Sequence, residues 1–203
     1  MRALAALLLL LACGCTGPIL PKQPRPTTFE GAWAEERDRY TRSFQLYDEL
    51  DDVAFATATY QAPPVREARV NRLAEWKGMQ PAEREALLAA EREAAASSEE
   101  FLLAFFTSDR AANDLASRRG TWRIALLVQA DGEAEGLPVK VETVRTDPTV
   151  RALYPYVTDF DQLYRIRFPR FPGPRPLAEL PFVLRVAGAK GRVEMRWQPG
   201  PVP

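Results

Sequence analysis

The spacing of apolar residues in the first part of the chain is typical of helices. Over residues 29–61, apolar side chains recur three, four or seven positions apart, which is the period of a helix with one buried face. These positions are Phe29, Trp33, Tyr40, Phe44, Tyr47, Leu50 and Ala54. Thr28 suits the N-cap position, and the pair Pro63-Pro64 would end the helix. We therefore expect one long helix in this segment.

Three more segments before residue 120 also favour helices. Residues 65–77 carry an apolar stripe and end at Gly78, which suits a helix C-terminus. Residues 82–96 follow Pro81 and have high intrinsic helix propensity. The run FLLAFF at residues 101–106 is the most apolar stretch after the first 15 residues. We expect it to be a helix that packs the helical half against the rest of the protein.

Beyond Gly120 the apolar period changes to two, which is the period of strands. Alternating runs occupy residues 122–129, 139–144, 163–168, 182–186 and 193–197, with a short sixth candidate at 154–158. A glycine-containing segment at 187–191 suits a hairpin turn between the last two. The pattern predicts an α+β protein in which an N-terminal segment of three to four helices, residues 29–120, packs on a C-terminal antiparallel β-sheet or a small immunoglobulin-like sandwich of five to six strands, residues 121–200.

The first 15 residues have the plan of a secretory leader. One arginine precedes an apolar run at residues 3–12, and small residues with the chain's two cysteines follow. The run is shorter than the roughly 20 residues that span a bilayer. Residues 1–15 resemble the precursors of bacterial lipoproteins, and this resemblance implies that a cysteine becomes lipidated after cleavage. Two registers fit: Cys13 has the better residue three positions before it, and Cys15 gives the more usual leader length. We favour Cys13.

Residues 16–28 contain four prolines and no aromatic residue, as expected for a tether. A proline-rich linker extends about 3.1 Å per residue, so this segment can hold a domain roughly 40 Å from a membrane. The lipoprotein resemblance further implies retention at the outer membrane, facing the periplasm, because Gly14 or Thr16 rather than aspartate follows the cysteine. The alternative is an ordinary cleaved signal peptide that leaves a soluble exported protein.

Composition removes several classes of chemistry. The 27 basic and 27 acidic residues give a net charge of zero, which argues against nucleic acid as a partner. The chain has no histidine, and both of its cysteines lie in the leader. These absences remove Ser-His-Asp and Cys-His catalysis, a histidine general base and histidine-containing zinc sites. We therefore expect no cofactor and a role that is not enzymatic.

Four acidic residues match the spacing of an EF-hand calcium loop, but their context argues against calcium. Asp131, Glu133, Glu135 and Glu142 fall at ligand positions of that loop, with Gly136 at its sixth position. The segment lies between two strand patterns rather than two helices, and glutamate stands where shorter side chains are needed. We expect a solvated hairpin turn and no bound metal.

Residues 168–181 form a proline-rich connection between two strand patterns. An extended loop here would present Arg170, Phe171 and Arg175, and arginine and aromatic side chains are enriched at the centres of interfaces. The alternative is a crossover that packs on the sheet with Phe171 beneath it.

Together, the leader, the composition and this loop predict a lipid-anchored cell-envelope protein that acts as a binding or assembly module for another envelope protein. The alternatives are a periplasmic carrier of a lipid or other apolar ligand, and a carboxylate-based hydrolase of envelope polymers.

Overall fold

A computed structural model of the 203-residue chain describes residues 29–199, apart from 50, 130, 131, 172 and 174. The leader and the tether, with Cys13 and Cys15, lie outside the described residues. In the described part the helices are α1 (Phe29–Arg39), α2 (Pro63–Lys77), α3 (Pro81–Ser97) and α4 (Pro148–Leu153). The strands are β1 (Thr41–Asp48), β2 (Asp51–Tyr60), β3 (Ser98–Thr107), β4 (Trp122–Gln129), β5 (Glu133–Gly136), β6 (Lys140–Val144), β7 (Gln162–Pro169), β8 (Phe182–Gly188) and β9 (Gly191–Trp197).

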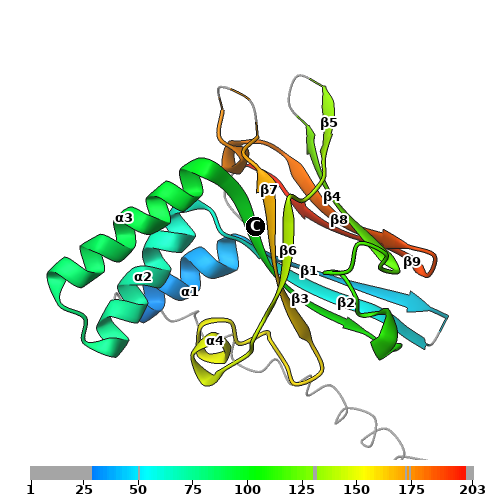
Figure 1. The fold of residues 1–203 in the computed structure, drawn as a ribbon, viewed down its shortest axis with the longest axis horizontal. Helices are drawn as coiled ribbons and strands as arrows, with labels where there is room; N and C mark the ends of the chain where they lie inside the picture. The colour runs from blue at the N-terminus through cyan, green and yellow to red at the C-terminus, as the bar shows by residue number, and fades with distance from the viewer. Residues whose placement is uncertain (1–28, 50, 130–131, 172, 174, 200–203) are drawn as a thin grey trace, which may run out of the picture.

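The strands form two antiparallel sheets. The larger sheet has five strands in the order β1-β2-β3-β7-β6, and the smaller has four in the order β5-β4-β8-β9. Helices α1, α2 and α3 gather at one side of the five-stranded sheet (Figure 1). The protein therefore has a mixed α+β fold, which confirms the fold class predicted from the sequence. The structure does not show an immunoglobulin-like sandwich. Six of the described strands follow Gly120, within the five to six predicted for that region, whereas β1, β2 and β3 precede it, where helices were expected.

The long helix expected over residues 29–61 is wrong beyond Arg39. Helix α1 ends there, and the hairpin of β1 and β2 takes up the rest of the segment. On β2 the residues Ala54, Ala56 and Ala58 are at most 2% exposed and alternate with less buried ones, which is a period of two. The prediction relied on the larger apolar side chains, so it missed a buried face built from alanine.

The apolar run at residues 101–106 is a strand and not the expected docking helix. It belongs to β3, which lies between β2 and β7 in the five-stranded sheet. Seven of the ten positions in β3 are buried in one unbroken row, from Glu99 to Phe105, so both faces of the strand are covered. A short continuous apolar run fits either a buried strand or a buried helix, and periodicity alone does not separate the two.

The helices are also not confined to the first half of the chain. Helix α4 begins after Asp147, whose Oδ1 accepts a hydrogen bond from the backbone N–H of Val150 at 2.8 Å. Pro148 occupies the first helical position. The Asp147-Pro148 pair is a sequence signal for the start of a helix, although no helix was predicted here.

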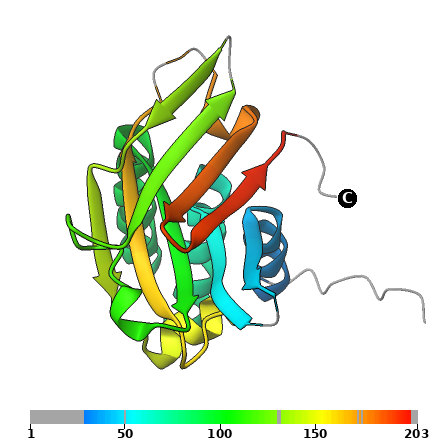
Figure 2. The same cartoon turned by 90° about the vertical axis from the view of Figure 1, so that its right-hand side faces the viewer.

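The two sheets share one hydrophobic core. The ring of Phe101 on β3 packs against Phe182 and Trp197 of the smaller sheet, with ring centroids 5.9 Å and 5.6 Å apart. Figure 2 shows β4, β8 and β9 in front of the five-stranded sheet and the helices behind it. The expected hairpin turn between the last two strands is confirmed, because β8 and β9 pair from Phe182↔Trp197 to Gly188↔Gly191. Within the described residues, no helix is long and apolar enough to cross a membrane.

Candidate functional site

One pocket among the described residues lies between the helices and the face of the five-stranded sheet that points away from the smaller sheet. We call it the helix–sheet pocket; its volume is about 250 Å³. Its lining comes from α2, α3, α4 and strands β3, β6 and β7. The aliphatic lining residues are Val70, Leu73, Leu87, Leu102, Val144, Val150, Leu153 and Leu163. The polar ones are Gln61, Arg69, Glu91, Glu100, Tyr154 and Arg165.

Local structure explains how these side chains meet. Residues 66, 69, 70 and 73 are three or four positions apart on α2, so they share one face of that helix. Leu87 and Glu91 are likewise four apart on α3. In the sheet, the β3–β7 register pairs Glu100 with Arg167 and Leu102 with Arg165. The antiparallel pairing therefore brings two arginines from near the end of the chain beside a glutamate from its middle.

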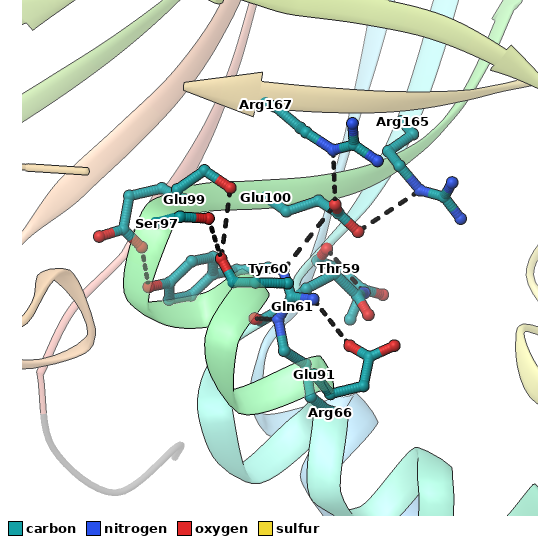
Figure 3. Close-up of polar contacts among 12 residues, drawn as sticks. Thr59, Tyr60, Gln61, Arg66, Glu91, Ser97, Glu99, Glu100, Arg165 and Arg167 are labelled. Atoms are coloured by element: carbon teal, nitrogen blue, oxygen red, sulfur yellow. Dashed lines mark hydrogen bonds and ion pairs between the residues drawn. The ribbon is translucent and has the colours of Figure 1, made fainter. Parts of the chain in front are cut away.

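A group of six paired charges borders the pocket. This charge cluster consists of Arg66, Arg69, Glu91, Glu100, Arg165 and Arg167. Glu100 accepts from Arg167 at 3.0 Å and lies 3.4 Å from Arg165, and the Nη2 atom of Arg66 is 3.9 Å away (Figure 3). The side chain of Glu100 is 10% exposed, so this carboxylate is compensated by cations rather than by water.

Glu91, the second acid of the charge cluster, forms ion pairs with two arginines of α2. Its two carboxylate oxygens lie 2.8 Å from Arg66 and 2.7 Å from Arg69. Burial on its own raises the pKa of Glu91, but the guanidinium groups of Arg69 and Arg66 outweigh it, so the pKa is lowered. Glu91 is therefore a stable anion at neutral pH.

A hydrogen-bond network completes the polar end of the pocket. The side-chain oxygen of Gln61 accepts from Arg69 at 2.7 Å and from the hydroxyl of Tyr154 at 3.2 Å. The Nε atom of Arg66 donates to the backbone oxygen of Gln61 at 2.8 Å. The Nη2 atom of the buried Arg66 has no hydrogen-bond acceptor in the described part of the chain, and only the Glu100 ion pair compensates it.

Glu99 belongs to a different environment from its neighbour Glu100. It accepts a hydrogen bond of 2.6 Å from the buried hydroxyl of Tyr60, which sits in the core between the two sheets. Burial first, and then the Glu99 carboxylate, raise the pKa of Tyr60. Because successive residues of a strand point to opposite faces, only Glu100 faces the helix–sheet pocket.

The three residues predicted to bind a partner have different surroundings. Arg170 donates to the backbone oxygens of Ala95 and Ala96, at 3.2 Å and 3.4 Å, at the C-terminal end of α3. Phe171 is half-buried and packs against the hydrophobic core, whereas Arg175 is exposed. Arg170 is exposed as well as Arg175, and Phe171 is the member of the three that packs on the core.

Of the four acidic residues that match the calcium-loop spacing, Glu135 and Glu142 lie on different sheets. Glu135 lies on β5 of the smaller sheet, and Glu142 lies on β6 of the larger one, where it pairs with Lys140 and Arg167. Asp131 and the side chain of Glu133 lie outside the described residues. Among the side chains that are described, no three acidic, cysteine or histidine residues are grouped as metal ligands.

No member of the charge cluster was among the site residues predicted from the sequence. Glu100 directly precedes the run that was expected to be a helix, and Arg165 and Arg167 lie in the strand pattern at residues 163–168. The fold thus defines an α+β protein with an aliphatic pocket beside a group of compensated charges. Comparison with known protein families, with curated proteins and with solved structures gives no match.

Proposed function

We propose that this protein is a lipid-anchored component of the bacterial cell envelope that binds another molecule without transforming it. The lipid would be carried by Cys13, or in the alternative register by Cys15, and the anchored domain would face the periplasm from the outer membrane. The supporting evidence is the lipoprotein-like leader at residues 1–15 and the proline-rich segment that follows it.

The pairing of the pocket's acids with arginines is the observation that favours binding over catalysis. A general acid at neutral pH needs a raised carboxyl pKa, as in glycoside hydrolysis. Arg69 and Arg66 instead lower the pKa of Glu91. Three arginines surround Glu100. The carboxylate-based hydrolase is therefore the weakest of the three candidate functions.

The choice between a carrier and an assembly module depends on which surface binds. The aliphatic lining of the helix–sheet pocket favours a small apolar or amphipathic ligand over a protein partner. For residues 168–181 the support is smaller, because Phe171 packs on the core and Arg170 bonds to α3. Arg170 and Arg175 are both exposed and are the candidates for a contact with another envelope protein.

Removal of both cysteines tests the anchoring. With Cys13→Ser and Cys15→Ser together, we expect the exported protein to move from the membrane fraction to the soluble periplasmic fraction. The two single variants serve as controls, and the one that reproduces the shift identifies the lipidated residue. An exported double variant that still sediments with membranes would contradict anchoring by lipid.

A further inference from the structure

We infer that the helix–sheet pocket binds a single-chain anionic amphiphile. Its acyl chain would lie along the aliphatic walls, and its carboxylate or phosphate group would bind the outer nitrogens of Arg165. This inference rests on the proposed binding function and names the class of ligand.

The size and lining of the pocket suit an acyl chain of medium length. Eight aliphatic side chains, from α2, α3, α4 and three strands, face the space. A dry apolar cavity of about 150 Å³ accommodates benzene, so a cavity of 250 Å³ has room for on the order of ten carbon atoms. A volume of about 250 Å³ suits one acyl chain better than two side by side.

Arg165 is the polar lining residue with donors to spare. Both terminal nitrogens of Arg69 are already engaged, by Glu91 on one side and by Gln61 and Tyr154 on the other. In Arg165 the Nε atom faces Glu100, while the two outer nitrogens point away from it (Figure 3). Its side chain is 40% exposed, and within the described residues those outer nitrogens have no acceptor. These nitrogens are therefore accessible to the headgroup of a ligand in the pocket.

The balance of charge around the pocket also favours an anion. The four arginines of the charge cluster face Glu91 and Glu100, and Glu142 is the third acid that contacts this group. Lys140 adds a further cation beside Glu142. The positive charges thus exceed the negative ones, and an incoming carboxylate or phosphate lowers the excess.

Arg165 and Arg167 provide a matched pair for the test. Both lie on β7, point to the same face of the sheet and contact Glu100, but only Arg165 lines the pocket. Their substitution removes the same charge and disturbs the same acid. A difference in ligand binding between the two variants therefore reports the pocket and not the loss of a Glu100 ion pair.

The experiment uses the exported soluble form that carries Cys13→Ser and Cys15→Ser. Decanoate, monodecyl phosphate and 1-decanol are titrated by calorimetry, and methyl NMR of Leu73, Leu87 and Leu102 locates the bound chain. We expect Arg165→Gln to weaken binding of the anionic ligands by roughly tenfold or more, since charged hydrogen bonds are the stronger ones. We expect Arg167→Gln to change it by less than about threefold. Decanol affinity should be the same in both variants.

Two further variants distinguish a specific loss of ligand binding from a loss of folding. Arg165→Lys keeps the charge and should retain most of the affinity for the anions, and Val144→Phe should fill the pocket and abolish binding of all three ligands. Comparing decanoate with decyl phosphate shows whether a free acid or a phosphate headgroup is preferred. The inference is overturned if folded protein binds neither anion, if the methyl shifts lie elsewhere, or if Arg165→Gln and Arg167→Gln have equal effects. In any of these cases, membrane localisation through the cysteines would still support the proposed function.

Discussion

Glu91 and Glu100 show how single residues bring charge into a partly apolar site. Both carboxylates are removed from most of the solvent, and each meets more than one guanidinium. Burial of charges without such partners costs several kcal/mol, so each residue of the cluster depends on the others. Removing one member should therefore destabilise the protein more than removing a charge from an exposed pair.

Glu91→Gln should reduce stability and flatten its acid dependence. The folded protein lowers the pKa of Glu91, so the stabilisation is complete above the ordinary value of 4.5 and is lost as the pH falls through the lower folded pKa. We expect a loss on the order of 2 kcal/mol at neutral pH and a smaller difference near pH 3. Urea unfolding at several pH values measures both effects.

The matched control is Glu85→Gln on the same helix. Glu85 pairs with Arg92, but both side chains are more than half exposed, so little change is expected at any pH. Stability curves of wild type and Glu91→Gln that run parallel from pH 3 to pH 7 would contradict the assigned role of Glu91.

Phe171→Ala separates packing from binding in the segment 168–181. Because Phe171 is half-buried against the core, its truncation should cost about 2 kcal/mol, below the full value for a buried phenylalanine. For a protein of this size the melting temperature should fall by roughly 4–8 °C. Thermal unfolding followed by circular dichroism measures this, with Arg175→Ala as the exposed control from the same segment. An unchanged melting temperature would instead support Phe171 as a contact for a partner.

At the scale of elements, β3 connects the two halves that the sequence pattern had separated. It pairs with β2 from the first half and with β7 from the second, and its side chains enter both the core and the helix–sheet pocket. The five-stranded sheet therefore combines strands from before and after residue 120, where the sequence pattern changes from helical to strand-like. A strand buried on both faces carries no alternation, which is why its sequence resembled a buried helix.

A chain that ends at Gly120 tests this dependence on β7. It would lose β7 and the smaller sheet, leaving β3 as an apolar edge strand with its core face uncovered. Such edges pair with other chains, so we expect aggregation rather than a monomeric helical domain. Size-exclusion chromatography and circular dichroism decide between these outcomes. A soluble monomer with cooperative unfolding would show that residues 29–120 fold independently.

At the scale of the whole molecule, the sequence by itself determined the features that depend on neighbouring residues. Strands β4, β6, β7, β8 and β9, the helices near 65–77 and 82–96, and the β8–β9 turn occur where periodicity and turn residues predicted them. Strand β5 was not predicted, and the short candidate at residues 154–158 is not a strand. These patterns are local, because a helix or a half-exposed strand shows its buried face within a few residues. The leader and tether remain predictions from the sequence.

Only the tertiary structure decided which residues meet. The β1–β2 hairpin and β3 are hydrogen-bonded to neighbouring strands and are buried by other parts of the fold. One neighbour of β3 is β7, which lies more than 50 residues further along the chain. The charge cluster depends on the same pairing, since Glu100 and Arg167 become neighbours only through the β3–β7 register. No local pattern records a contact between residues 67 positions apart, so this site became visible only in the folded chain.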